Sequence, residues 1–186
     1  MQIAIDIDNV IANTFQDLVP HFNQFVGQKM EPIQVIQFMR QKKLKMLGYY
    51  LNAWQKRLMT KISLIDGAAE TIRLWHQTHN IKLITSRMPL FNKQTRYWLN
   101  KHNIPFHELH HAKEMNKYKK ADGCQIFIED NIEESEILAD HCEKILLLDH
   151  PWNRRKLNKS NILRVNNWRE IKSVLDTPLC CSQSPS

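Results

Sequence analysis

Two aspartates near the start of the chain have the residue type and spacing for phosphate chemistry. Asp6 and Asp8 stand two positions apart after a short apolar run, so both side chains can face one side of a strand end. Two close carboxylates repel, which raises one pKa unless a divalent cation removes the repulsion. Magnesium prefers oxygen ligands and is usually held by one or two carboxylates together with substrate phosphate. We therefore predict a Mg²⁺ site that includes Asp6.

The same pair could carry out both parts of a phosphate ester hydrolysis. An aspartate carboxylate can attack a phosphoryl group and form an aspartyl-phosphate, while a metal ion neutralises the phosphoryl oxygens. A second carboxyl group, protonated at first, must donate a proton to the leaving alkoxide and can later take one from water. We assign the attack to Asp6 and the proton transfers to Asp8.

Further polar residues follow two later apolar runs. Thr85 and Ser86 follow one of them, and Asp130 follows another. Ligands of an open parallel sheet bind beyond the carboxyl ends of its strands, so these groups are expected to converge with the first aspartates. We predict Asp6 and Asp130 as the side-chain metal ligands. Arg87 is placed either to touch a substrate phosphate or to remain in solvent, and the sequence leaves both open.

Strands and helices that would position these residues alternate along the chain. Apolar runs predict the strands, and apolar residues at helical spacing predict the helices between them. This order is typical of an α/β fold with a Rossmann-like, mainly parallel sheet that has helices on both faces. The predicted strands are 2–7, 82–85, 126–128 and 145–148, with weaker candidates at 106–109 and 162–165; the predicted helices are 67–79, 92–101, 131–142 and 168–175.

Residues 14–64 interrupt this alternation, because they contain no convincing strand and their apolar residues recur at helical spacing. We interpret the segment as a small helical cap inserted after the first strand. The alternative is that its helices belong to the main core. The expected division is a catalytic core of residues 1–13 and 65–176, a helical cap of 14–64, and a tail of 177–186 that is expected to be disordered.

Composition and charge narrow the class of protein. No apolar run approaches the ~18 residues of a membrane span, and the N-terminus lacks the features of a secretory signal, so no membrane partner is expected. The four cysteines form no C-x-x-C pair, which favours a reduced, cytoplasmic protein. The net charge of +7 suits a small anionic substrate; a nucleic-acid partner stays open but is not favoured, because aromatics are not interleaved with the basic residues.

Three motifs in order resemble the haloacid dehalogenase-like (HAD) phosphatase superfamily, and its 5'(3')-deoxyribonucleotidase branch in particular. They are Asp-Ile-Asp-Asn-Val-Ile-Ala from Asp6 for motif I, Leu-Ile-Thr-Ser-Arg ending at Arg87 for motif II, and Ile-Glu-Asp-Asn ending at Asn131 for motif IV. The run Asp-His-Pro-Trp-Asn at 149–153 and the pair at 167–168 also resemble this branch. The resemblance covers roughly residues 1–175 and departs at Asn9, where many relatives have the more permissive Gly.

The resemblance implies a role for each matched residue. Asp6 would be nucleophile and metal ligand, and Asp8 would be the acid/base whose backbone carbonyl also binds Mg²⁺. Thr85 would bind the phosphoryl group, with Ser86 as a second hydroxyl, and Asp130 would complete the metal site. Motif III requires a lysine shortly before residues 126–128; the candidates are Lys113, Lys117, Lys119 and Lys120, of which we select Lys117.

The resemblance implies Mg²⁺-dependent hydrolysis of a 5'- or 3'-(deoxy)nucleoside monophosphate, with the small cap sealing the pocket from water. Two alternatives stay open. One is a HAD phosphatase of a sugar phosphate or a nucleic-acid end, which the basic residues at 40–45 would suit. The other is a non-catalytic phosphate- or nucleic-acid-binding module. The sequence sets neither the base and sugar nor the oligomeric state.

Overall fold

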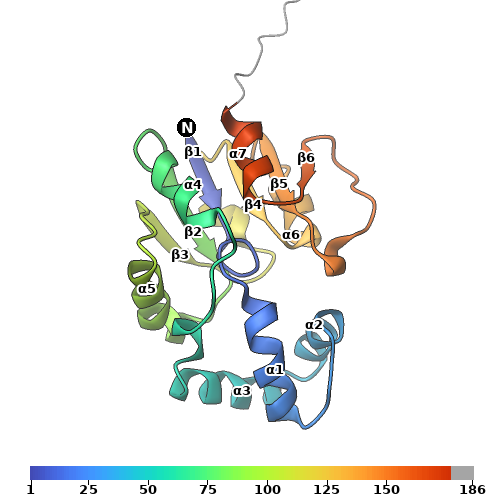
Figure 1. The fold of residues 1–186 in the computed structure, drawn as a ribbon. Helices are drawn as coiled ribbons and strands as arrows, with labels where there is room; N and C mark the ends of the chain where they lie inside the picture. The colour runs from blue at the N-terminus through green and yellow to red at the C-terminus, as the bar shows by residue number, and fades with distance from the viewer. Residues whose placement is uncertain (177–186) are drawn as a thin grey trace, which may run out of the picture.

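A six-stranded, fully parallel sheet forms the centre of the protein (Figure 1). The computed structural model describes residues 1–176, so the expectation for the tail at 177–186 lies outside the described residues. The strand order is β3-β2-β1-β4-β5-β6. The strands are β1 (Gln2–Ile5), β2 (Asn80–Thr85), β3 (Glu108–His111), β4 (Ile126–Glu129), β5 (Lys144–Leu148) and β6 (Ile162–Val165).

All six predicted strands are present; β2, β4 and β5 are one or two residues longer than predicted, and β1 and β3 differ as follows. β1 ends at Ile5 rather than at residue 7, although the backbone N–H of Asp6 still donates to the Ile128 carbonyl at 3.0 Å. β3 begins two residues later than predicted, and none of its four residues is fully buried. An edge strand pairs on one side only, which explains why its apolar pattern was weak.

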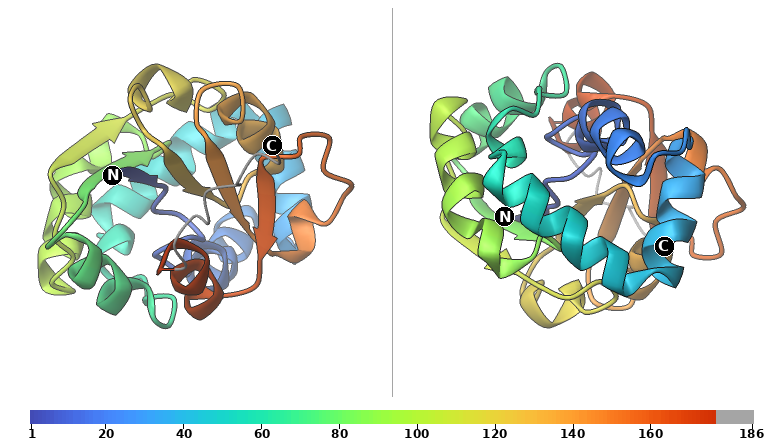
Figure 2. Two further views of the ribbon diagram at one scale, coloured as in Figure 1. Left: turned by 90° about the horizontal axis from the view of Figure 1, so that it is seen from above. Right: turned by 90° about the horizontal axis from the view of Figure 1, so that it is seen from below.

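Helices cover both faces of the sheet (Figure 2), as the alternation of strands and helices predicts. Side chains along β1 alternate between two clusters: Ile3 and Ile5 belong to one and Ala4 to the other. The first cluster includes residues of α4 (Ala68–Trp75), α5 (Asn92–Lys101) and α7 (Trp168–Asp176); the second includes residues of α6 (Ile132–Leu138). The 3₁₀ helices are η1 (Leu58–Thr60), η2 (Pro89–Phe91), η3 (Lys117–Lys120) and η4 (Pro151–Asn153).

Residues 14–64, which we call the helical insertion, contribute helices and no strand to this sheet. They form α1 (Thr14–Val26), α2 (Pro32–Gln41), α3 (Lys43–Gln55) and η1. Figure 1 shows the three α-helices at the end of the molecule toward which the strands point. The ring of Phe22 holds them together, because it packs edge-on against Phe38 at 5.4 Å and Tyr49 at 5.0 Å.

Two buried tryptophans fix the chain on either side of the insertion. The indole N–H of Trp168 donates to the Val10 carbonyl at 2.7 Å, and that of Trp98 donates to the Ile62 carbonyl at the same distance. Both bonds are buried, so they satisfy the polar end of an otherwise apolar ring. The loop after β1 and the return from the insertion are thereby anchored to α7 and α5.

Candidate active site

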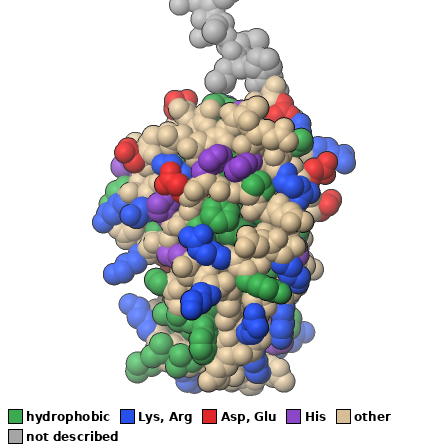
Figure 3. Space-filling model, turned by 90° about the vertical axis from the view of Figure 1, so that its left-hand side faces the viewer, with side chains coloured by type: hydrophobic (Ala, Val, Ile, Leu, Met, Phe, Trp, Pro, Cys, Tyr) green, Lys and Arg blue, Asp and Glu red, His purple; other side chains and the backbone are tan. Residues whose placement is uncertain are grey.

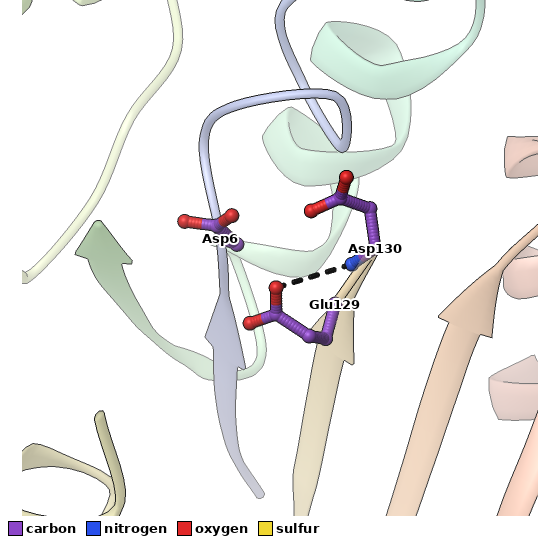
Figure 4. Close-up of side chains that lie close together, drawn as sticks. All are labelled: Asp6, Glu129 and Asp130. Carbon is purple, nitrogen blue, oxygen red and sulfur yellow. Dashed lines mark hydrogen bonds between the residues drawn. The ribbon is translucent and has the colours of Figure 1, made fainter. Parts of the chain in front are cut away.

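Three carboxylates meet at the carboxyl ends of the two central strands (Figure 4). Asp6 follows β1, while Glu129 ends β4 and Asp130 follows it. Because β1 pairs in parallel with β4, the two strands end side by side. One oxygen from each carboxylate lies within 4.8 Å of the others, and all three residues are buried. The structure therefore brings together the two residues that the sequence predicts as side-chain metal ligands.

Lys117, selected among four candidate lysines, points its ammonium group into this cluster. Its Nζ lies 3.0 Å from Asp6 Oδ1 and 2.8 Å from Glu129 Oε2, and the residue is only 3% exposed. Burial lowers the pKa of the Lys117 ammonium, but the charges of Asp6 and Glu129 outweigh burial and raise it. Lys117 is therefore a permanent positive charge beside Asp6.

The cluster has more negative charge than Lys117 can balance. Burial raises the pKa of Asp6, and it raises the pKa of Asp130 and of Glu129 to about 7 each. Three ionised carboxylates against one ammonium would leave a net negative charge in a buried space. Apart from its ion pair with Lys117, Asp6 Oδ1 is buried without a hydrogen-bond partner among the described residues. These oxygen donors fit a hard divalent cation such as Mg²⁺.

The carboxylate of Asp130 is held by two donors from distant parts of the chain. Trp152 Nε1 donates to Oδ2 at 3.0 Å, and Asn9 Nδ2 donates to the same oxygen at 3.2 Å. Asn153 Nδ2 binds the Asp130 backbone carbonyl at 2.7 Å. Asn9 adopts a left-handed backbone with φ of 56°, a conformation that asparagine tolerates better than most residues. The run at 149–153 thus orients Asp130 within the carboxylate cluster.

Asp8 lies beside the cluster and is bound by Arg87. The guanidinium places Nε 3.0 Å from both carboxylate oxygens of Asp8 and Nη2 2.8 Å from Oδ1. Thr14 Oγ1 donates to the same carboxylate at 2.5 Å. Burial raises the pKa of Asp8, but the charge and hydrogen bonds of Arg87 outweigh it, so the pKa is lowered. In this arrangement Asp8 is ionised.

The motif II residues occupy three different positions. Thr85 is completely buried; its Oγ1 accepts the Arg87 backbone N–H at 3.2 Å and lies 3.4 Å from Asp8 Oδ2. Ser86 is exposed and lines a cavity above the cluster. Arg87 is 7% exposed, so of the two alternatives for its side chain, solvation is wrong. Whether these residues contact phosphate stays a prediction.

A cavity of about 490 Å³ lies between the carboxylate cluster and the helical insertion. Six of the seven predicted site residues line it, and Thr85 lies behind it. The remaining wall is largely apolar and aromatic. Its members from the insertion include Phe15, Leu18, Val19, Phe22, Val35, Met39, Tyr49, Tyr50 and Met59, and those from the sheet side include Met88, Phe91 and Trp152.

Four of the charged side chains that line this cavity form ion pairs with one another, and one of them, Arg40, belongs to the insertion and joins it to the rest of the protein. Arg40 of α2 lies 2.5 Å from Glu133 and 3.7 Å from Glu114, and Arg155 lies 3.7 Å from Glu133. All four are between 35% and 54% exposed. We refer to them as the mouth ion pairs. Their charges compensate one another, so they add little net field to the cavity.

Sequence reasoning missed the residues that support the site from behind. Glu134 is completely buried and accepts the backbone N–H groups of Met115 and Lys117, at 2.5 and 3.0 Å. Its place in the first turn of α6 suggested only a favourable interaction with the helix dipole. Trp152 belongs to a run that had been noted only for its resemblance. No local pattern marks either residue, because each contacts residues that are distant in the sequence.

The sequence profile of one family matches nearly the whole chain. It is described as 5' nucleotidase, deoxy (pyrimidine), cytosolic type C protein, and the match spans residues 1–179. Among curated proteins, nucleotidase CA_C3379 of Clostridium acetobutylicum is 28% identical over 188 residues, which cover 95% of this chain and 94% of that protein.

Solved structures share the fold at low identity. A predicted phosphoglycolate phosphatase from Haemophilus somnus 129pt superimposes with a TM-score of 0.69 at 12% identity, covering 94% of this chain and 97% of the other. A HAD-superfamily hydrolase of subfamily IA from Geobacter sulfurreducens PCA gives a TM-score of 0.62 at 13% identity, covering 94% and 95%. At such identities the similarity shows the HAD-like α/β fold, as the sequence predicts.

Proposed function

Because the chain belongs to the 5' nucleotidase, deoxy (pyrimidine), cytosolic type C family within the HAD superfamily, we propose that it hydrolyses (deoxy)nucleoside monophosphates with Mg²⁺ through an aspartyl-phosphate. Membership in this family makes the chain a phosphoric monoester hydrolase rather than a non-catalytic binding module. The observation that carries the proposal is the position of Asp6. Its carboxylate lies beside Lys117, within 4.8 Å of an Asp130 oxygen, and lines an apolar cavity.

The proposed metal ligands are the carboxylates of Asp6 and Asp130 and the backbone carbonyl of Asp8. The excess of buried negative charge in this cluster supports them. When bound, Mg²⁺ would neutralise charge on the phosphoryl oxygens. Glu129 is already paired with Lys117 at 2.8 Å, so we assign it to holding that lysine rather than to the ion.

Asp6 is the proposed nucleophile. Its oxygen would form the new bond to phosphorus as the bond from phosphorus to the leaving oxygen breaks. Lys117 supports this role, because its ammonium group lies 3.0 Å from Asp6 Oδ1 and offsets the charge of a phosphoaspartate. Water would then release phosphate and restore the carboxylate.

Asp8 is the proposed acid and base, and its contact with Arg87 sets a condition on that role. A general acid must hold a proton, whereas Arg87 favours the ionised carboxylate. A substrate phosphate is a second anionic partner for the same guanidinium. We propose that Arg87, together with Thr85 and Ser86, turns to the phosphoryl oxygens when substrate binds, which frees Asp8 to carry the proton.

The cavity supports a nucleoside as the leaving group. Its walls are mainly aromatic and aliphatic, which suits a flat base better than the many hydroxyl groups of a sugar phosphate. We propose that the helical insertion acts as the cap, because it supplies most of this wall and would exclude water during the phosphoenzyme step.

A substrate panel tests the proposed class. Phosphate release should be highest with a subset of nucleoside and deoxynucleoside monophosphates, low with sugar phosphates, and lost on chelation of Mg²⁺. A preference for sugar phosphates would overturn the nucleotide assignment while leaving the hydrolase in place.

Trapping of the phosphoenzyme tests the mechanism. Acid-quenched protein should gain the mass of one phosphoryl group, and peptide mapping should place it on Asp6. Asp6→Asn should lose turnover by roughly 10⁴-fold or more, because the nucleophile is removed, while retaining the melting temperature of a folded protein. An Asp6→Asn variant with ordinary activity would contradict the nucleophile assignment.

A further inference from the structure

The positive charge of the protein is concentrated in the helical insertion. Residues 14–64 hold eight of the 26 Lys and Arg residues but only two of the 19 Asp and Glu residues, so they carry +6 of the net charge of +7. On the face in Figure 3, the acidic side chains lie over the upper part, while Lys, Arg and hydrophobic side chains occupy the lower end. The rest of the chain is nearly neutral.

One helix of the insertion also presents apolar side chains to solvent. Met46, Tyr49 and Ala53 form the buried face of α3. The opposite face carries four large apolar residues at helical spacing, with exposed fractions of 88%, 49%, 51% and 46%; these are Leu44, Leu47, Leu51 and Trp54. Phe25 of α1 is 42% exposed and lies next to α3 at Gly48. We call these five residues the apolar stripe.

Basic residues border the stripe at both ends of α3. Lys42, Lys43 and Lys45 lie at its first turn, and Lys56 and Arg57 follow its last. Cations at a helix N-terminus oppose the helix dipole, so the first three lysines do not stabilise α3. Among the described residues, Arg40 is the only basic side chain of the insertion in an ion pair. The remaining charges are therefore available to an anionic partner.

The surface lies at one end of the molecule. In the right-hand view of Figure 2, α3 runs across the end face nearest the viewer, with α1 and α2 beside it. Because α3 lies outermost at this end, its exposed side chains can meet a partner along the whole length of the helix. It suits a broad, flat partner that accepts apolar side chains in its interior and attracts lysines at its rim.

We propose that this end of the protein docks on an anionic lipid surface, with the apolar stripe inserted at the level of the headgroups. A helix with Leu and Trp on one face and lysines beside them is typical of interfacial binding, and anionic headgroups attract each nearby basic residue. None of the described helices is long and apolar enough to cross a membrane. The expectation of no membrane partner rested on the lack of a span, which peripheral docking does not need.

Two other occupants fit the same observations less well. If a second copy docked through the stripe, two helical insertions with a net charge of +6 each would face one another. Like charges disfavour such a contact. A nucleic acid would satisfy the lysines but would leave the three exposed leucines against phosphates, with Trp54 as the single large aromatic of α3's outer face. Lipid satisfies both the charge and the apolar side chains.

Vesicle sedimentation of the full chain tests the proposal. Vesicles that mix phosphatidylglycerol with phosphatidylcholine should bind the protein, and pure phosphatidylcholine vesicles should bind it much less. The change of Lys42, Lys43 and Lys45 to Gln should weaken binding by roughly 100-fold. The control is the same change at Lys93, Lys101 and Lys156, which removes an equal charge from the surface outside the insertion and should have little effect. Binding should also fall as salt rises.

Matched apolar variants test the stripe. The double variant Leu44→Gln and Leu51→Gln should reduce binding by roughly tenfold or more, whereas Leu74→Gln with Leu163→Gln, two exposed leucines outside the insertion, should not. Neither pair lines the cavity, so nucleotide hydrolysis should be unchanged in all these variants.

Three results would overturn the proposal. They are failure of the wild-type protein to sediment with anionic vesicles, equal effects of the stripe and control pairs, and a dimer in solution that the stripe pair dissociates. The last result would assign the face to a second copy. None of these measurements depends on turnover, so a wrong substrate assignment would not be confused with a wrong docking surface.

Discussion

Asp130 illustrates how a single carboxylate is held in place by residues from distant parts of the chain. Trp152 and Asn9 both donate to Oδ2, and among the described residues no hydrogen bond is made to Oδ1. Trp152 also stacks on His150 at 4.3 Å and meets the ring of Phe15 edge-on at 4.9 Å. One side chain therefore orients a proposed metal ligand and forms part of the cavity wall.

The change Trp152→Phe should separate these two roles. Phenylalanine keeps an aromatic ring beside His150 but cannot donate a hydrogen bond to Asp130. We expect the dissociation constant for Mg²⁺, measured by calorimetry, to rise by roughly 10- to 100-fold, as for other residues that hold metal ligands. Trp54→Phe, a matched change at an exposed position of α3, is the control. Equal Mg²⁺ affinity in wild type and Trp152→Phe would mean that the indole only fills space.

At the scale of elements, the segment that carries Lys117 is held by α6 in addition to its own backbone hydrogen bonds. Glu134 binds two backbone N–H groups there, at Met115 and Lys117. Asn131 in turn caps α6, because its Oδ1 accepts the N–H groups of Glu133 and Glu134 at 2.9 and 3.3 Å. The position of the Lys117 ammonium thus depends on the helix that follows Asp130.

Glu134→Gln should disturb this arrangement without a change of shape. The amide has one acceptor oxygen where the carboxylate has two, so one of the two N–H groups loses its partner. We expect kcat to fall by roughly 10- to 100-fold, because small displacements of a catalytic group have effects of that size. Glu136→Gln, on the same helix but bonded to Asn158, should keep its kcat. A Glu134→Gln enzyme with unchanged kcat would refute the positioning role.

The elements and the central residues of the site could be read from the sequence. Buried strands such as β4 and β5 are continuous apolar runs, and acidic residues at their ends mark the ligand edge of a parallel sheet. The bond between Arg87 and Asp8 could not be read in this way, because the position of Arg87 in the sequence does not decide whether its long side chain turns toward the site or toward solvent. The same holds for Glu134 and Trp152.

At the scale of the whole molecule, the buried carboxylates couple stability to pH. Glu129 and Asp130 each have a pKa raised to about 7, from ordinary values of 4.5 and 3.8 in the unfolded chain. These two groups then hold more protons in the folded state than in the unfolded state between about pH 4 and 7, so their contribution to stability is greatest below this range and is lost as pH rises through it. The lowered pKa of Asp8 has its opposite effect only at lower pH.

We therefore expect the melting temperature of the metal-free protein to fall between pH 5 and 8. Mg²⁺ should reverse the fall, by about 2.7 kcal/mol when its concentration is 100 times the dissociation constant. Calorimetry across this range with EDTA or with Mg²⁺ provides the measurement. Asp130→Asn should flatten the pH dependence and abolish most of the response to Mg²⁺. A metal-free protein that becomes more stable from pH 5 to 8 would contradict the assignment.

The mouth ion pairs lie across the entrance of the cavity, apart from the buried apolar packing and the Trp98 hydrogen bond that anchor the insertion. Each joins side chains that are about one-third to one-half exposed, and pairs of this kind contribute roughly 0–1 kcal/mol. Separation of these pairs alone therefore costs little free energy. The entrance can then widen at these pairs while the rest of the insertion stays packed, and a rise in ionic strength should favour the wider entrance by screening the paired charges.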